Sequence, residues 1–462
     1  MRRSNKHEMR KVALSPLSGG LNLALPPEQI GETEMQECQN MWYERDSQRL
    51  VGRGGLKAVS SYESPIRSLF YDVESNMSFV FLYDKNCYSA TLSDVETNRR
   101  NIGRVKGDGR AKCCKFGSDL FIASGEELQY YTFASGTSLQ DIANAPKADI
   151  VFYRFGRLAV AKMGNSSRIT LSSTGDAKSD VAWTENSADA SYSQWIDIGD
   201  RDSGYIMDVV PLATDMIVFK SNGKAYQFTG DATPDTWAVY NIANYTDVTN
   251  GFKQGDLATN IGNEVVFLSL RGLKTLSTTQ DYGNIAASDI GAKFNKLLTR
   301  RQYEPELYDM RRHKTLLIRA TTDKATWVAY NYALNAATVI KFGVEVEAIL
   351  ETKDDVYVAS GNTLYHWDDE LTTDDGEPIE YIVKPRDVIG SDELLVKAID
   401  TKLSSDHAGS ATVSIGERLK VEMPTNSRRK VKCNHSTDCI SLTVKSTSRF
   451  ELDHIALDVV DL

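Results

Sequence analysis

A repeated phrase of strand, turn and strand is the feature that most limits what this chain can fold into. The segments 118–131 and 355–367 both contain an apolar β-rich run, a glycine turn and a second β-rich run, in the same order. About seven such units follow one another at roughly 35–60 residues, a spacing typical of a solenoid or a β-propeller. Their content is strand and turn rather than helix, so the pattern predicts an all-β protein.

Each unit contains two or three predicted strands, whose aromatic and β-branched residues must be buried against another unit. A lone hairpin is marginal in water, so the units must stack, and a radial array leaves only short edges exposed. The clearest turn is Asn222-Gly223, a strong hairpin signal. The predicted units cover 66–92, 110–133, 149–173, 205–229, 256–278, 314–342 and 344–367.

The predicted fold class is an all-β, six- or seven-bladed β-propeller with an N-terminal arm, an inserted helix and a small C-terminal β-sandwich. The arm covers 1–60 and includes a short helical stretch at 32–40. The propeller covers 61–371, with a helical insertion near 288–312 where apolar residues recur at helical spacing. An acidic, turn-rich linker then leads to a sandwich or platform domain at 372–462, in which apolar and polar residues alternate.

Charge and hydropathy restrict the function. The chain has 462 residues and a formal net charge of −10. Tight binding to a nucleic-acid backbone relies on clustered Lys and Arg, which an acidic surface opposes; such a surface still lets DNA slide past without adhering. No apolar run approaches the roughly 18–20 residues of a membrane span, and residues 1–11 lack the apolar core of a secretory signal. We therefore expect folding in a cytoplasm and no membrane span.

The cysteines predict neither a disulfide framework nor a metal centre. Six cysteines are few for so long a chain. Cys113 and Cys114 are adjacent, so on a strand their side chains point to opposite faces. Cys433, His435 and Cys439 come nearest to a metal-binding pattern, but no fourth ligand lies close by in sequence. Free thiols and a polar histidine on a sheet are the favoured interpretation, and no cofactor is expected.

The familiar catalytic motifs are missing from the sequence. The glycines of 103–109 lack the context of a phosphate-binding loop, and the six histidines are scattered. The acidic pairs at 354–355 and 374–375 fall in turns, whereas paired carboxylates must face one another across a cleft to hydrolyse glycosides. We expect no enzyme and no catalytic residues, and no binding residue is identified. Trp367-Asp368 occurs without a Gly-His partner, so a WD40 scaffold is a poor match.

The N-terminal passage resembles the opening of a family of propeller proteins from short-tailed bacteriophages. The family comprises the tail nozzle or tail tubular protein B group, with related head-completion and DNA-stabilisation proteins. A second phrase resembles a late blade of the same group and the helix after it. The first phrase consists of Gly19-Gly20-Leu21-Asn22, Pro26-Pro27, 32–38, Gln39-Asn40-Met41 and 49–55; the second consists of 266–269, Gly272-Leu273 and 289–291. The C-terminal sandwich matches no named part of a nozzle.

This resemblance implies a structural protein of the virion tail, assembled in the cytoplasm of the bacterial host. The family implies a ring of identical subunits, commonly six, around the DNA exit channel, acting in genome retention and ejection. Its implied partners are the tail adaptor and portal-side ring proteins, tail fibres and double-stranded DNA in transit. Two alternatives remain open: a head-completion plug that retains packaged DNA, and a propeller on the virion that binds host glycan.

Overall fold

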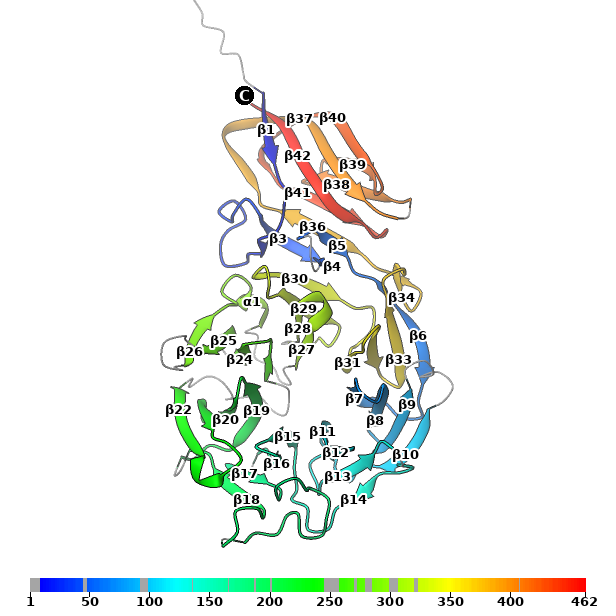
Figure 1. Cartoon of the computed structure of the whole chain (residues 1–462). Helices are drawn as coiled ribbons and strands as arrows, with labels where there is room; N and C mark the ends of the chain where they lie inside the picture. Colours follow the sequence, from blue (N-terminus) through cyan, green and yellow to red (C-terminus); the bar gives the residue numbers. More distant parts are fainter. Residues whose placement is uncertain are drawn as a thin grey trace, which may run out of the picture.

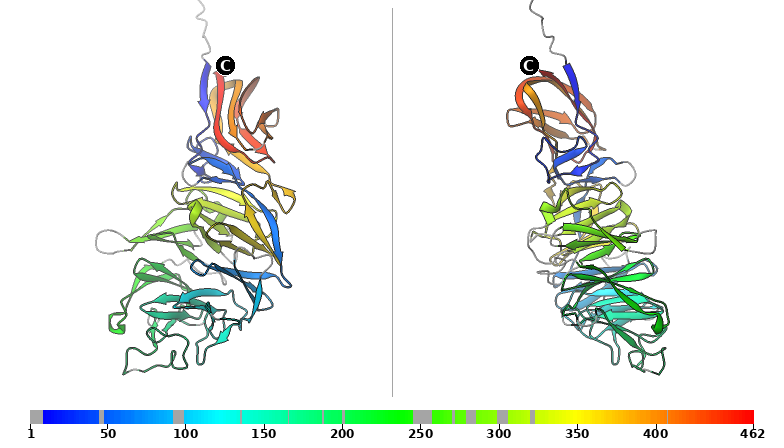
Figure 2. Two further views of the ribbon diagram at one scale, coloured as in Figure 1. Left: turned by 45° about the vertical axis from the view of Figure 1, so that its right-hand side comes forward. Right: turned by 90° about the vertical axis from the view of Figure 1, so that its left-hand side faces the viewer.

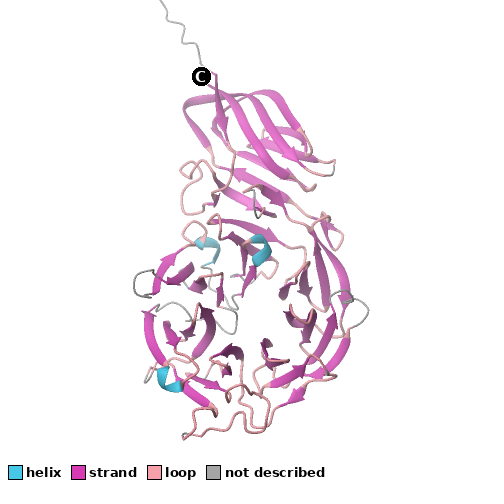
Figure 3. Ribbon diagram, viewed as in Figure 1, coloured by secondary structure: helices cyan, strands magenta, loops and turns pink. Residues whose placement is uncertain are grey.

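A ring of radial β-sheets and a two-sheet body stacked on its rim make up this protein (Figure 1). The structure is a computed structural model, and almost all of its regular secondary structure is strand (Figure 3). Turned by 90°, the ring is seen edge-on as a disc below the second body (Figure 2). The described residues are 9–44, 48–91, 99–134, 136–164, 166–186, 188–199, 202–244, 257–269, 272–278, 285–298, 306–319, 323–406 and 408–462.

The blades of the ring are antiparallel sheets in which consecutive strands pair. The first three are β7 (Ile66–Asp72), β8 (Met77–Leu82), β9 (Asn86–Thr91) and β10 (Arg100–Arg104); β11 (Lys112–Phe116), β12 (Asp119–Ala123), β13 (Gln129–Thr132) and β14 (Gln140–Asp141); and β15 (Ile150–Arg154), β16 (Arg157–Ala161), β17 (Arg168–Leu171) and β18 (Gln194–Asp197). The next three are β19 (Ile206–Leu212), β20 (Asp215–Lys220), β21 (Lys224–Thr229) and β22 (Ala238–Asn244); β23 (Ala258–Asn260), β24 (Glu264–Ser269), β25 (Gly272–Thr278) and β26 (Ile285–Asp289); and β27 (Glu306–Met310), β28 (Thr315–Arg319), β29 (Thr326–Asn331) and β30 (Ala336–Lys341).

The last blade is completed by a strand from the start of the chain. It contains β31 (Ala348–Glu351), β32 (Val356–Ser360) and β33 (Thr363–Asp368). Its outer partner for β33 is β6 (Gly55–Ser61), which pairs antiparallel from Thr363↔Ser61 to Asp368↔Gly55. Two short strands, β34 (Thr373–Asp374) and β35 (Glu377–Pro378), extend the same sheet. Because β6 leads directly into the first blade, this pairing closes the ring.

The propeller core lies between neighbouring blades, as the two faces of β12 illustrate. All five residues of β12 are buried. Leu120 and Ile122 pack toward the preceding blade, while Phe121 and Ala123 pack toward the following one. Alternate side chains of a strand point to opposite faces, so a strand buried on both faces reads as a continuous apolar run. The adjacent cysteines at 113 and 114 also divide between these two clusters, which confirms their predicted opposite orientation.

The second body is a sandwich whose sheets combine strands from both ends of the chain, with an apolar core between them. One sheet contains β1 (Met9–Ala13), β4 (Met41–Tyr43), β5 (Leu50–Gly52), β37 (Val388–Ser404), β40 (Arg428–Ile440) and β42 (Glu451–Asp461). The other contains β2 (Gly20–Leu21), β3 (Glu34–Gln39), β36 (Tyr381–Pro385), β38 (Ser410–Ile415), β39 (Leu419–Pro424) and β41 (Leu442–Ser446), and it continues into β30 of the propeller.

The structure differs from the sequence-based expectations in its N-terminal part. The predicted helix at 32–40 is wrong, since this segment contains strand β3, which pairs with β36 on one side and with β2 on the other. Buried Met35 and Cys38 belong to the sandwich core, so sheet pairing overrides a weak helical pattern. An N-terminal arm over 1–60 is not confirmed, because the strands β1 to β6 are built into the sheets of both bodies.

The inserted helix near 288–312 is also not confirmed. The described part of this range contains the end of β26, the one-turn helix α1 (Asn295–Leu298), strand β27 and the 3-10 turn η3 (Arg311–His313). The rest, 299–305, lies outside the described residues. Phe294 and Leu298 are buried against the next blade. The helical spacing of apolar residues seen in the sequence therefore comes from one short turn that packs on that blade, not from a longer helix. A second 3-10 turn, η2, covers Pro234–Thr236. In the described part of the chain, no helix could span a bilayer.

Candidate functional site

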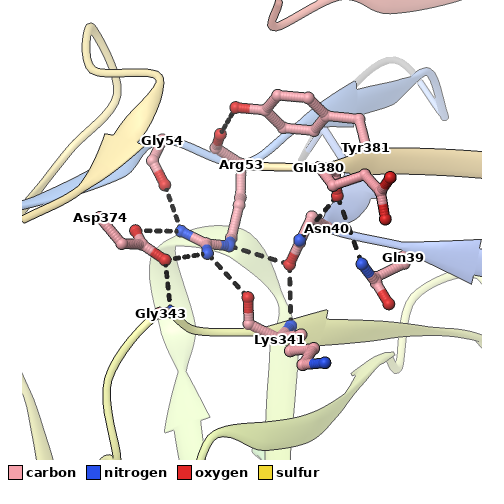
Figure 4. A network of polar contacts seen from close by, with 9 residues as sticks. All are labelled: Gln39, Asn40, Arg53, Gly54, Lys341, Gly343, Asp374, Glu380 and Tyr381. Atoms are coloured by element: carbon pink, nitrogen blue, oxygen red, sulfur yellow. Dashed lines mark hydrogen bonds and ion pairs between the residues drawn. The ribbon is translucent and has the colours of Figure 1, made fainter. Parts of the chain in front are cut away.

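A buried arginine forms the centre of the junction between propeller and sandwich (Figure 4). The side chain of Arg53 is 0% exposed. Its Nη1 donates to Asp374 Oδ1 at 2.9 Å and to the Gly54 carbonyl at 2.8 Å. Its Nη2 pairs with Asp374 Oδ2 and donates to the Lys341 carbonyl at 2.9 Å, and its Nε donates to Asn40 Oδ1 at 3.1 Å. Bidentate, charge-assisted pairs of this kind are among the strongest hydrogen bonds in proteins.

The partners of this arginine connect the two bodies further. Asn40 follows β3 and donates from Nδ2 to the Glu380 carbonyl at 2.8 Å, while its Oδ1 accepts the Lys341 N–H. The hydroxyl of Tyr381 donates to the Arg53 carbonyl at 3.0 Å, and burial raises the pKa of Tyr381 to about 12. These contacts join strand β30 of the propeller, the β34 extension of the last blade, and the sandwich strands β3 and β36. Propeller and sandwich therefore form one unit.

A second contact at the junction connects the loop before β3 to the segment after β26. The Leu23 N–H donates to the Lys293 carbonyl at 2.7 Å, and Lys293 Nζ lies 2.9 Å from Glu34 Oε1. Asn22 Nδ2 and the Gly31 N–H both donate to Glu34 Oε2 at 2.7 Å. Burial opposes ionisation of this carboxyl group, but these donors together hold its pKa below the ordinary value. The segment just after β26 and the passage that enters β3 are therefore neighbours in space.

Glycines in both segments occupy positions where a side chain would not fit. Gly20 has a φ of +70°, and a Cβ there would lie 2.6 Å from the Ala337 backbone nitrogen. Gly272 has a φ of +118°, and its Cβ would lie 1.9 Å from Asn295 Oδ1. That oxygen accepts the Leu273 N–H at 3.1 Å. Only glycine combines a positive φ with so close an approach.

Charged side chains cross the centre of the propeller. The strands β7, β11, β15, β19, β27 and β31 lie nearest the axis (Figure 1). Lys112 Nζ on β11 lies 3.2 Å from Asp208 Oδ1 on β19, although the blade that begins with β15 comes between them in sequence. Arg110, just before β11, pairs with Glu306 at the start of β27, and Arg319 lies 2.8 Å from the same carboxylate. We call these contacts the hub ion pairs.

The acidic members of the hub ion pairs are almost fully buried. Asp208 and Glu306 are each 2% exposed. Asp208 Oδ2 also accepts the backbone N–H groups of Leu257 and Ala258 at 3.0 and 3.2 Å. Several donors to one buried carboxylate fix its position. The side chains of Arg110 and Lys112 therefore occupy the axial space at this level.

One carboxyl group on an inner strand titrates in an unusual range. Asp309 on β27 has a side chain only 9% exposed, and its Oδ2 lies 3.3 Å from Arg311 Nε. Burial raises the pKa of Asp309 to about 6, although Arg311 opposes the shift. The Glu351 carboxylate adds to it by like-charge repulsion. A carboxyl group of this kind is a general-acid candidate only beside a substrate cleft.

The structure does not bring the predicted metal-ligand candidates together. Cys433, His435 and Cys439 all lie on strand β40. A strand rises about 3.3 Å per residue, so the two thiols are separated by roughly 20 Å. Cys433 Sγ instead lies 3.4 Å from the Val396 carbonyl, and both cysteines are free thiols whose pKa is raised by burial. Among the described residues, no group of three or more His, Cys, Asp or Glu side chains could hold a metal.

Sequence reasoning missed the residues that define the junction and the hub. Arg53 and Asp374 are far apart in the chain, and so are Arg110 and Glu306. The available signal was weak: Arg53 lies in a glycine-rich phrase, and Asp374 lies in a turn that was interpreted as a solvated linker. A buried arginine needs buried hydrogen-bond acceptors, but the sequence does not say which residues supply them.

Comparison with known proteins assigns no family to this chain. No protein-family model matches the chain, and no curated protein matches it. Solved β-propellers are similar in fold: the WD40 propeller domain of Doa1 (8% identity, 68% of this chain and 97% of that chain, TM-score 0.43) and the RRP9 WD40 repeats (8%, 68% and 98%, 0.44). The extracellular domain of the putative hybrid two-component system BT4673 from B. thetaiotaomicron matches at 10% identity, covering 91% of this chain and 62% of that chain, with a TM-score of 0.49.

Proposed function

We propose that this chain is a structural protein of a bacteriophage tail and forms a ring, or nozzle, around the DNA exit channel. One observation carries the proposal. Glu34 and Gly19 of the first phrase both contact Lys293, which lies two residues beyond the second phrase, and this joint fixes the sandwich to the propeller. The two matching segments are far apart in sequence but lie together in the fold. This supports a fold shared with the nozzle family more strongly than two matching segments with no spatial relation would.

In this proposal the subunit is a seven-bladed propeller with the sandwich as its platform. Seven apolar clusters of described residues, each shared by two neighbouring blades, support that count. The hub ion pairs occupy the axis of each propeller, so DNA passes between subunits rather than through one. A net charge of −10 suits such a conduit, because a negative wall does not retain phosphates.

The proposal assigns no catalysis to the chain. The buried charges of the hub and of the junction are engaged in ion pairs, which is how structural charges are held. The fixed joint around Arg53 would let the subunit bear load as one piece during genome passage. The partners proposed are further copies of the chain, adaptor and portal-side ring proteins, and tail fibres.

Electron microscopy of the purified protein and of the native particle tests the proposed function. Rings with a central bore, and density for this chain at the distal tip of the tail, are the expected results. Particles that lack the protein should still retain DNA but lack a tail tip. Leakage of packaged DNA from complete-looking particles would favour the head-completion plug instead. A strictly monomeric protein that binds a host glycan on an array would overturn the assignment.

A further inference from the structure

The outer face of the six-stranded sandwich sheet can be identified from its pairing register. Residues directly opposite one another in an antiparallel pair point to the same face. Lys11 lies opposite Asp458 on β42. Asp458 lies opposite Ala398, whose other partner is Lys432 on β40. The next residue along β37, Ile399, points into the sandwich core, so this row of residues lies on the outer face.

Five cationic side chains gather on this outer surface, which we call the basic face: Lys11, Lys402, Arg428, Lys430 and Lys432. The side chains at 11, 402, 428 and 430 are 52%, 52%, 60% and 53% exposed. The carboxylates beneath them, at 400, 453 and 458, are only 5%, 15% and 13% exposed. The surface that these described residues present to solvent is therefore basic.

The basic face is an exception on an acidic protein. Its five cations and three carboxylates sum to +2, so the rest of the chain carries −12 of the total of −10. The pKa of His454, which lies on the same face, is lowered by burial and then by the charge of Lys11. Charge complementarity therefore indicates an acidic protein surface as the partner of this face.

An acidic hollow borders the basic face, where the turn after β33 meets the end of β37 and the start of β42. It is a cavity of about 420 Å³ lined by four carboxylates, one arginine and neighbouring polar residues. The charged lining residues are Asp369, Glu370, Asp406, Arg449 and Glu451, which sum to −3. Burial raises the pKa of Glu451, and nearby carboxylates add to the shift. A cation docked there would relieve this repulsion.

We infer that the basic face of one subunit docks on the acidic hollow of a second copy of this chain. The inference rests on the proposed ring and assigns its subunit contact. The proposed ring requires a head-to-tail contact, and two different surfaces of one chain supply it. Such contacts generate closed rings when the rotation between subunits closes. This partner fits better than nucleic acid, because the chain as a whole carries a net charge of −10, which repels phosphates.

Charge-reversal variants on the two surfaces test the contact. The basic-face variant is Lys402→Gln with Lys432→Glu, and the hollow variant is Glu370→Lys with Asp406→Lys. A control matched to the basic-face variant, Lys353→Gln with Lys57→Glu, makes the same charge change on the propeller. Each surface variant should weaken self-association at least about tenfold by sedimentation velocity, because like charges then oppose one another. The control should associate as the wild type does.

Mixing the two surface variants provides a readout that misfolding cannot imitate. Each variant alone presents two surfaces of like charge, whereas the mixture again pairs opposite charges. The mixture, and a chain carrying all four substitutions, should recover the assembled species at low salt. About 1 M salt, where the screening length is about 3 Å, should weaken assembly of the wild type and of the mixture alike.

The outcomes separate this inference from the proposed function. Rings that form equally well from both surface variants overturn the docking contact and leave the nozzle proposal intact. A mixture that stays dissociated also overturns the contact. A wild type that forms no assembly at any salt concentration overturns both. Tight binding of double-stranded DNA, lost in the basic-face variant while self-association is unchanged, would assign the face to nucleic acid instead.

Discussion

The ammonium group of Lys293 lies 2.9 Å from the carboxylate of Glu34, which joins the end of the fifth blade to the loop that enters the sandwich. The Leu23 N–H, donated to the Lys293 carbonyl, fixes the same loop by its backbone. The joint therefore combines an ion pair with a main-chain hydrogen bond. Together with the Arg53 network, it gives the two bodies two separate attachments on the same rim of the propeller.

The Arg53 network should dominate the stability of the junction. We expect Arg53→Met to lower the free energy of unfolding by about 3–5 kcal/mol, because it leaves a buried carboxylate without its cation. The double substitution Arg53→Met with Asp374→Leu should cost less, since it removes both charges. Urea denaturation followed by tryptophan fluorescence measures each value. Lys445→Met, which removes an exposed ion pair with Glu380, should change the stability by no more than about 1 kcal/mol; equal effects of the two single substitutions would contradict this account.

Gly20 should not tolerate a side chain. Gly20→Ala places a Cβ against the backbone of Ala337 at a positive φ. We expect a loss of about 2–5 kcal/mol, from left-handed backbone strain and overpacking together. Gly262→Ala is the matched control, because Gly262 also has a positive φ (+92°) but has open space around it. The control should cost only the backbone term of about 1–2 kcal/mol, and thermal unfolding of both variants makes the comparison.

Removing the acidic partner of the hub ion pairs at Glu306 should cost more stability than removing the basic partner Arg110. Glu306→Ala leaves Arg319, which is 5% exposed, without its carboxylate, and should cost about 3–5 kcal/mol. Arg110→Ala leaves Glu306 still paired with Arg319 and should cost about 1 kcal/mol. Calorimetric unfolding of the two variants measures this difference. A larger loss from Arg110→Ala would show that the pair across the axis, rather than the one between β27 and β28, carries the stability.

Asp309 should make stability fall as pH rises through the mildly acidic range. Its pKa rises from 3.8 to about 6 on folding, so the folded state binds more protons than the unfolded state between those values. Stability is then greatest below about pH 4 and declines up to about pH 6, by on the order of 3 kcal/mol. Asp309→Asn should remove this slope in urea titrations at a series of pH values, while Asp354→Asn, in an exposed turn, should keep it. A slope that survives Asp309→Asn would assign the effect to another group.

The strand pattern of the propeller was largely readable from the sequence. The Asn222-Gly223 turn joins β20 and β21 as predicted, with Gly223 at a φ of +79°. The all-β propeller and an additional C-terminal sheet follow from period-two patterning, because it encodes which face of a strand is buried. The helix predicted at 32–40 was wrong because two buried residues three apart fit either a helix or an irregular strand, and sheet partners decided between them.

What the sequence determined alone is the local alternation of apolar residues and the turns that separate strands, since both depend on neighbours within a few positions. Only the tertiary structure decided which distant strands pair, as when β6 closes the last blade and β1 borders β42. Alternation specifies the buried face of a strand but not its partner. The same reason explains why Asp374 was not recognised as the counterion of Arg53: the energy of a buried charge depends on three-dimensional proximity, which no spacing along this chain encodes.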